Sequence, residues 1–471
     1  MTNQPQGGAR SKPSPEKRRF VNRRSLEEKA FRCLLLLAAA LITCPLCRAN
    51  QVDDFVNGYL QTKQIPGCAV MVRKDGQVVL SAGYGLANLE HGVKVTPKTV
   101  FQSGSVGKQF TAMAVMMLVE EGRLSLGDPV SKYLKVPSSW SKITIRHLLT
   151  HTSGLGDYPE KFSLQKDYSE EELLKMVTAQ TLDFAPGDGW NYSNLGYLTL
   201  GLVIHKVTGE FYGNFLQKRI FKRLGMNDTR IISEAEIIPN RAAGYRLENR
   251  ALKNQEWISP SINTTADGSL YLTIEDMAKW DEALDKRMLL SPGSYEQMWT
   301  PARLNDGSAT SYGFGWSLGK NALGHRLIEH GGAWQGFATY IGRHPDDHLS
   351  VVVLSNRAGA NADYIANVVA GFYVPGLAPQ GPSAAKIDPA VLDSYAGDYR
   401  LLNRLNLKLV VVGDHLETEW LGQKLVLVPE SPTKFFEEDS DRTLRFIKDR
   451  SGRVNAAVLS VPEELTLRRV P

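Results

Sequence analysis

The sequence predicts an α+β fold in which an antiparallel sheet packs against helices and a small, separate antiparallel β domain follows. Three observations predict it. Strand-like segments with turn residues occur near residue 75 and again near residue 345, long apolar helical runs lie between them, and short alternating segments follow residue 390. The chain has 471 residues, which is more than one hydrophobic core usually holds, so division into domains is expected.

The strands of the predicted sheet come from both ends of the first domain. Residues 69–73 and 78–82 are rich in apolar side chains, and Lys74-Asp75-Gly76-Gln77 between them is typical of a hairpin turn. Further strands are predicted at residues 325–330, 336–342 and 349–355, with Pro345-Asp346-Asp347 as a turn. We expect these later strands to be antiparallel, with helices filling the middle of the chain.

The C-terminal part differs in kind from what precedes it. Residues 375–390 are rich in Pro, Gly, Ala and Ser, which is typical of a linker. Residues 391–471 contain short alternating segments separated by turn residues, at 395–400, 407–412, 416–420, 424–428, 434–438, 443–448 and 455–460. This spacing predicts a small antiparallel barrel or sandwich.

Residues 1–49 have the composition of a leader segment. Residues 1–32 are largely polar and basic, and residues 33–44 form an apolar run that is too short to span a bilayer comfortably. Small residues before Asn50 favour cleavage there, which predicts a periplasmic or secreted protein. If the leader is not cleaved, residues 33–47 would anchor the protein in the inner membrane.

The basic character of the chain comes from this leader. Without it, 45 Lys and Arg residues stand against 47 Asp and Glu residues, and the formal charge is −2. No basic patch with interleaved aromatic residues occurs, so nucleic acid is not an expected partner. Only Cys68 remains of the four cysteines, which leaves no partner for an intramolecular disulfide, and we expect it to be a small buried side chain.

The most informative functional segment is Ser105-Val106-Gly107-Lys108. Ser-x-x-Lys occurs seven times in the chain, but only here does it open a long apolar helix, predicted over residues 105–121. Lys108 shares a helix face with Ser105, and a backbone N–H at the helix start can face a developing oxyanion. The lysine can act as a base only in its neutral form, which burial favours. The segment therefore predicts a nucleophile beside its base.

Two later segments carry further candidate site residues. Tyr192-Ser193-Asn194 lies in a short polar loop before a helical run over residues 198–207, and its tyrosine could relay protons. Residues 327–332 are predicted as a strand that contains His330, and its last residues lack bulk, which leaves room for a substrate backbone. We expect His330 to line the same cleft as Ser105.

In this order and spacing the three segments resemble the serine beta-lactamase and penicillin-binding-protein superfamily. The nearest branch is the class C-like group of DD-peptidases, D-aminopeptidases and esterases. The resemblance covers about residues 52 to 372 and includes Phe101-Gln102-Ser103-Gly104, residues 126–130 and residues 143–155. It implies a beta-lactamase/transpeptidase-like antiparallel sheet with flanking helices and an all-helical insert, in a serine hydrolase domain over residues 50–374. The β domain at residues 391–471 resembles the accessory barrel appended to several such hydrolases.

The resemblance also implies catalytic roles. Ser105 would attack a carbonyl and form an acyl-enzyme, with Lys108 as its base. Tyr192, hydrogen-bonded between Lys108 and His330, would pass the proton to the leaving group and then help to activate the deacylating water. No metal and no cofactor are expected. His147 and His151, although four residues apart, have no obvious acidic third ligand.

Substrate-binding roles follow in the same way. The backbone N–H groups of Ser105 and Ala333 would form the oxyanion hole, with Gly332 beside the substrate backbone. Asn194 would bind Lys108 and the carbonyl oxygen of the substrate. The expected partner is a small-molecule or peptide substrate.

One departure from the family pattern bears on the substrate. His330-Gly331-Gly332 stands where beta-lactamases typically carry Lys-Thr-Gly or Lys-Ser-Gly, so the contacts for a substrate carboxylate are weakened. The sequence therefore favours an exported hydrolase of D-amino-acid peptides, D-amino-acid amides or small esters. A class C-like beta-lactamase and a DD-carboxypeptidase remain as alternatives, and a non-catalytic penicillin-binding sensor or binding protein is the alternative from a different class.

Overall fold

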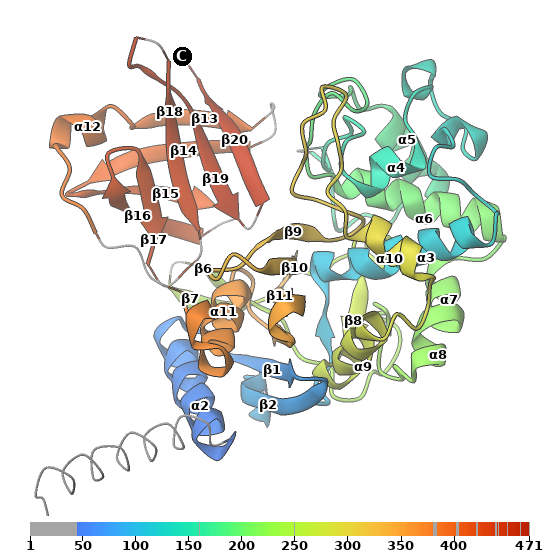
Figure 1. Ribbon diagram of the computed structural model, residues 1–471, viewed down its shortest axis with the longest axis horizontal. Coiled ribbons are helices and arrows are strands. Elements are labelled where there is room, and N and C mark those ends of the chain that lie inside the picture. Colours follow the sequence, from blue (N-terminus) through green and yellow to red (C-terminus); the bar gives the residue numbers. More distant parts are fainter. Residues whose placement is uncertain are drawn as a thin grey trace, which may run out of the picture. The chain divides into compact units, whose positions relative to one another are not determined.

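A computed structural model describes residues 45–159, 161–248, 250–379, 384–401, 405–420, 423–438, 440, 442–449, 451–461 and 463–470. It confirms the predicted fold class, because helices and antiparallel strands are mixed in the first part and a closed barrel of antiparallel strands follows (Figure 1). Most of the predicted leader lies outside the described residues. None of the described helices is both long enough and apolar enough to cross a membrane.

The central sheet has seven strands in the order β3-β2-β1-β12-β11-β10-β9. Its neighbouring strands are antiparallel, as predicted. The strands are β1 (Gly67–Lys74), β2 (Gln77–Asn88), β3 (Val93–Lys94), β9 (Ser317–Lys320), β10 (Arg326–Trp334), β11 (Phe337–His344) and β12 (Leu349–Ser355). The pairing of β1 with β12 joins the first hairpin to the late strands, with Cys68 opposite Ser355. Cys68 is fully buried, and burial raises the pKa of its thiol to about 12.

Helices cover both faces of this sheet, which explains why β1 is buried along almost its whole length. Alternate residues of a strand point to opposite faces. Val70 and Val353 pack in one core with α2 (Pro45–Thr62) and α11 (Ala362–Tyr373). Met71 and Val352 pack in a second core that contains α3 (Lys108–Glu120) and α9 (Ile274–Asp285).

A buried ionic cluster ties α9 to the sheet. The carboxylate of Asp281, which is fully buried, accepts hydrogen bonds from Arg73 of β1 at 3.2 Å and Arg343 of β11 at 2.6 Å. The hydroxyl of Ser350 on β12 donates to the same carboxylate at 3.0 Å. One acidic side chain thus holds three strands and a helix together.

Most of the remaining helices lie between β4 (Phe101–Gln102) and β9. They are α4 (Ile145–Leu149), α5 (Glu170–Thr178), α6 (Asn194–Thr208), α7 (Tyr212–Leu216), α8 (Lys222–Leu224) and α10 (Pro292–Met298). Three begin at side-chain caps that the sequence supplies, because Thr144, Ser169 and Ser193 each accept a backbone N–H of the first turn. Short strands β5 (Arg230–Ile231) and β8 (Leu270–Leu272) join β4 in a small sheet, and β6 (Tyr245–Glu248) pairs with β7 (Ala251–Asn254).

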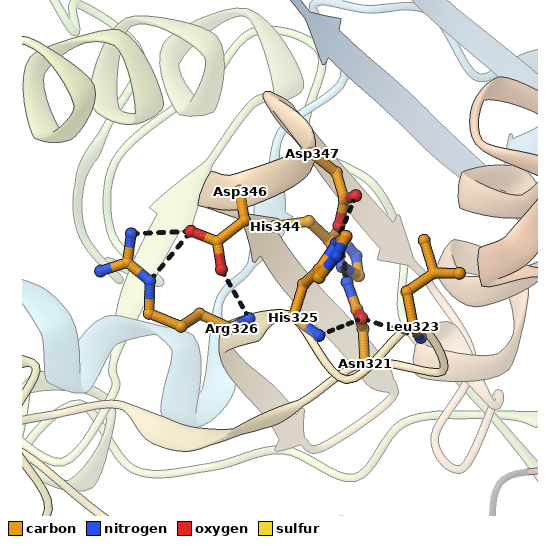
Figure 2. Close-up of polar contacts among 7 residues, drawn as sticks. All are labelled: Asn321, Leu323, His325, Arg326, His344, Asp346 and Asp347. Carbon is orange, nitrogen blue, oxygen red and sulfur yellow. Dashed lines mark hydrogen bonds and ion pairs between the residues drawn. The ribbon is translucent and has the colours of Figure 1, made fainter.

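The loop from β9 to β10 is fastened to the turn between β11 and β12 (Figure 2). Asn321 donates to Asp347 at 2.7 Å, and the Nδ1 atom of His325 lies 2.8 Å from the same carboxylate. Arg326 and Asp346 form an ion pair at 2.9 Å beside them. These contacts fix the start of β10, the strand that carries His330.

The C-terminal strands close into a barrel, so the predicted alternative of a sandwich is excluded. Its strands are β13 (Gly397–Leu401), β14 (Leu405–Val412), β15 (His415–Trp420), β16 (Gln423–Ser431), β17 (Lys434–Glu437), β18 (Thr443–Lys448), β19 (Val454–Val461) and β20 (Glu463–Arg469). The sequence did not predict β20, whose residues are mostly charged or polar. The short helix α12 (Pro389–Asp393) begins within the segment predicted as a linker.

Candidate active site

Ser105 lies in a 3₁₀ turn (Gly104–Gly107) that leads directly into α3. The predicted helix over residues 105–121 is therefore corrected: the α-helix begins at Lys108, and the backbone N–H of Lys108 bonds the carbonyl of Ser105 in the tighter i to i+3 pattern. Gly104 begins the turn with φ of +51°, a left-handed conformation that a side chain disfavours. Ser105 thus sits just before the N-terminus of a buried helix.

Strand β10 lies against this turn at two glycines. A Cβ atom on Gly332 would come within 2.3 Å of the carbonyl oxygen of Ser103, and one on Gly104 would come within 2.5 Å of the backbone nitrogen of Ala333. Only residues without a side chain allow this approach. The structure therefore brings Gly332 and Ala333 beside the residues that precede Ser105, where the sequence predicts an oxyanion hole.

Lys108 is fully buried, and its amine lies among oxygen atoms of other residues. The Nζ atom lies 3.0 Å from Ser105 Oγ, 2.7 Å from Asn194 Oδ1 and 2.5 Å from the backbone oxygen of Asp267. Asp267 precedes β8 and is 159 residues from Lys108 in the chain, and the contact uses its main chain. Each predicted contact of Lys108 with Ser105 and Asn194 is present as a hydrogen bond.

Asn194 is held at the start of α6. Ser193 caps the helix by accepting the N–H of Gly196 at 2.9 Å, and its hydroxyl donates to the carbonyl of Gly156 at 2.7 Å. The Nδ2 atom of Asn194 donates to both carboxylate oxygens of Asp157, at 3.1 and 3.0 Å. Burial raises the pKa of Asp157, although its hydrogen bonds and the charge of Lys108 act in the opposite direction.

The ring of Tyr192 packs between Lys108 and His151. Lys108 Nζ lies 4.9 Å from the centroid of the tyrosine ring, and the ring centroids of Tyr192 and His151 are 4.4 Å apart. The Nδ1 atom of His151 accepts the backbone N–H of Ser193 at 3.0 Å. Burial holds the pKa of His151 well below its usual value, so this ring is neutral and orders the Tyr192 loop.

His330 is buried on β10, and both ring nitrogens have partners. Nδ1 lies 2.6 Å from the carbonyl oxygen of Gly331, and Nε2 lies 2.7 Å from the hydroxyl of Tyr312. Burial, with the nearby charge of Lys108, lowers the pKa of His330 to about 3. The ring centroid lies 6.3 Å from that of Tyr192. His330 therefore belongs to the same cluster as Tyr192 but is neutral over the physiological pH range.

Sequence reasoning missed four residues of this cluster. Asp157 directly follows the segment 143–155 and Gly156, so its place next to a family motif was the available signal. Tyr312 and Asp267 reach the site from distant segments without a motif. His151 was considered in the sequence only as a possible metal ligand and was given no role in the site. Across the part of the chain that the structure describes, no group of three or more His, Cys, Asp or Glu residues could hold a metal ion.

Comparison with known proteins agrees with this geometry. The family model described as Beta-lactamase matches residues 52–371. Penicillin-binding protein 4* of Bacillus subtilis (strain 168) is 30% identical over 393 residues, which cover 78% of this chain and 87% of that protein.

Two solved structures are similar as well. The octameric penicillin-binding protein homologue from Pyrococcus abyssi has a TM-score of 0.65 and 28% identity, and the match covers 89% of this chain and 100% of that one. A D-stereospecific amidohydrolase from Streptomyces sp. has a TM-score of 0.56 and 25% identity, over 67% of this chain and 97% of that one. The protein is a member of the beta-lactamase family of serine hydrolases and penicillin-binding proteins.

Proposed function

We propose that the protein is an exported serine hydrolase that forms an acyl-enzyme on Ser105 and cleaves a D-amino-acid peptide or amide, or a small ester. The observation that carries the proposal is the buried amine of Lys108, 3.0 Å from Ser105 Oγ. An amine at this distance can take the hydroxyl proton as the oxygen attacks a carbonyl carbon.

The proposed reaction has two halves. In the first, Ser105 Oγ bonds to the carbonyl carbon, its proton passes to Lys108, and the oxyanion is stabilised by the N–H groups of Ser105 and Ala333. Tyr192 conveys the proton to the leaving nitrogen or oxygen as that bond breaks. In the second, water attacks the acyl ester, its proton returns through the same groups, and the acid product leaves Ser105 free.

The neutral state of His330 supports a substrate without a carboxylate at this position. A lysine on the strand would offer a permanent positive charge, whereas His330 has a pKa of about 3 and spends both ring nitrogens on Gly331 and Tyr312. The likeness to the D-stereospecific amidohydrolase supports an amide substrate. The likeness to penicillin-binding protein 4* supports penicillin binding, so a DD-carboxypeptidase, a class C-like beta-lactamase and a non-catalytic penicillin-binding protein remain the alternatives.

A substrate panel tests the proposal. The full chain is given p-nitrophenyl esters, D-amino-acid amides with their L-enantiomers, D-Ala-D-Ala peptides and nitrocefin, and Ser105→Ala is the control. We expect turnover of the ester or the D-amide that is lost in Ser105→Ala. Faster nitrocefin or D-Ala-D-Ala hydrolysis would replace the proposed substrate class. A lasting penicilloyl adduct on Ser105, seen by intact mass without turnover of any substrate, would replace the enzyme with a sensor.

Export is part of the same proposal, because residues 1–49 have the composition of a leader. We place the mature protein in the periplasm or outside the cell, with a small molecule or peptide as its partner. Fractionation and N-terminal sequencing test this, and a protein with an uncleaved leader in the membrane fraction would favour the inner-membrane anchor.

A further inference from the structure

We propose that Asp157 is a positioning residue, which holds the side-chain amide of Asn194 in the orientation that presents its Oδ1 atom to the amine of Lys108, the proposed base. This inference rests on the proposed function, because it concerns how the proposed base is prepared. Asp157 accepts hydrogen bonds from Asn194 Nδ2. Its effect passes through Asn194.

The first step is a count of donors and acceptors around the amine. A neutral amine has two N–H bonds and one lone pair. Asn194 Oδ1 at 2.7 Å and the main-chain oxygen of Asp267 at 2.5 Å can only accept hydrogen bonds. In a neutral amine, both N–H bonds can point to these two acceptors. The lone pair can then face the hydroxyl of Ser105, which lies 3.0 Å away and is able to donate its proton.

The second step concerns the amide of Asn194, whose oxygen and nitrogen ends have nearly the same shape. If the amide were turned over, Nδ2 would face Lys108 and donate to the amine. That bond would occupy the lone pair and turn an N–H toward Ser105. The base would be blocked without any change in the backbone. Some contact on the far side of the amide must therefore select the productive orientation.

The third step is that Asp157 makes this selection. Both oxygens of its carboxyl group accept hydrogen bonds from Asn194 Nδ2, at 3.1 and 3.0 Å. In the turned-over amide, Oδ1 would face this carboxylate and oxygen would oppose oxygen. Asp157 is itself fixed by the backbone N–H of Tyr158, which donates to its Oδ1 atom at 2.8 Å.

The chain contains a matched pair that lacks this connection. Asn191 lies three residues before Asn194, and its Nδ2 atom donates to Asp183 Oδ2 at 2.9 Å. This pair orders the same loop and has the same chemistry as Asn194 with Asp157. The amide that forms a hydrogen bond with Lys108, however, is that of Asn194. Asp183 thus provides a control for the general effect of losing an Asn–Asp contact in this region.

The test compares Asp157→Asn with Asp183→Asn in the full chain. An asparagine at position 157 can accept or donate, so it no longer distinguishes the two orientations of Asn194. We expect kcat on the best ester or amide, and the rate of Ser105 phosphonylation by a fluorophosphonate, to fall by on the order of 10- to 100-fold. The phosphonylation rate is the decisive measurement, because Asn194 is also expected to bind the carbonyl oxygen of the substrate and KM can change with its orientation. Asp183→Asn should retain the wild-type rates.

A double variant separates orientation from folding. In Asp157→Asn with Asn194→Asp, the side chain at position 194 presents an acceptor to Lys108 whichever way it turns. We expect the double variant to recover part of the rate, with the acid side of its pH–rate profile moved to higher pH by the carboxylate beside the amine. Thermal unfolding of each variant shows that it is folded.

Three outcomes would overturn the inference: wild-type rates in Asp157→Asn, an equal loss in Asp183→Asn, or no recovery at any pH in a folded double variant. The proposed function fails separately. If wild-type Ser105 neither reacts with the fluorophosphonate nor turns over any substrate, the hydrolase proposal is wrong whatever Asp157 does. If the wild type reacts and Asp157→Asn reacts equally fast, only the role of Asp157 is refuted.

Discussion

Lys108 and Asp281 are both fully buried ionisable side chains of one domain, yet their surroundings differ in kind. Asp281 forms ion pairs with the guanidinium groups of Arg73 and Arg343, which neutralise its charge locally. Lys108 Nζ instead forms hydrogen bonds with neutral oxygens of Ser105, Asn194 and Asp267. Paired opposite charges favour one fixed ionisation state, whereas neutral acceptors leave the amine able to gain and lose a proton. The comparison indicates that one cluster serves the fold and the other serves chemistry.

The largest expected effect comes from removing the amine. In Lys108→Met, Ser105 has no base, and we expect the rate of acylation to fall by about 10²- to 10⁴-fold. The free energy of unfolding should change by no more than about 2 kcal/mol, because two acceptors lose their donor while an amine no longer has to be desolvated. Fluorophosphonate labelling and urea unfolding measure the two quantities. A large loss of stability with little loss of rate would reverse the assignment of this cluster to chemistry.

The corresponding change in the other cluster should act on stability. Asp281→Ala leaves Arg73 and Arg343 buried without their shared partner, and we expect a loss of about 3–5 kcal/mol in the free energy of unfolding. Asp285→Ala is the matched control. It removes a second carboxylate from Arg73, but that side chain is 55% exposed, so the loss should stay below about 1 kcal/mol. Equal losses in the two variants, measured by urea unfolding, would contradict the larger contribution of Asp281 to stability.

The sequence predicted the local parts of this comparison well. The hairpin of β1 and β2 follows from alternating apolar residues around Asp75-Gly76, and the structure confirms it. Ser105 and Lys108 are three residues apart, and local helical geometry brings Oγ and Nζ to 3.0 Å. Regular periodicity and short separations are what sequence patterns encode. The same reasoning predicted a small antiparallel barrel or sandwich, and the structure shows the barrel. It did not predict β20, because the residues of this strand show little apolar alternation.

Contacts between distant segments could not be predicted in this way. Asp267 contributes a main-chain oxygen to Lys108, and any residue type has one, so the sequence carries no mark of it. The hydroxyl of Tyr312 contacts His330, which lies 18 residues away in the chain. Nothing in the sequence distinguishes this tyrosine from the other buried tyrosines. The ionic partners of Asp281 come from β1 and β11, and only the sheet order brings them together. Tertiary packing, rather than local pattern, selects these partners.

The smallest effect concerns His330, a third buried ionisable group, which is kept neutral. Its pKa of about 3 in the folded protein lies below the ordinary value of 6.5. Above pH 6.5 the ring is neutral in both states, and His330 adds no pH dependence. Below pH 6.5 the unfolded chain binds a proton that the folded protein does not, so stability falls toward pH 3, by at most about 1.4 kcal/mol per pH unit. In His330→Gln, urea unfolding between pH 6.5 and 4 should show a shallower fall than in the wild type. An unchanged slope in His330→Gln would mean that the pKa of His330 is not lowered by folding, and the ring would then be cationic below pH 6.5 in the folded protein as well.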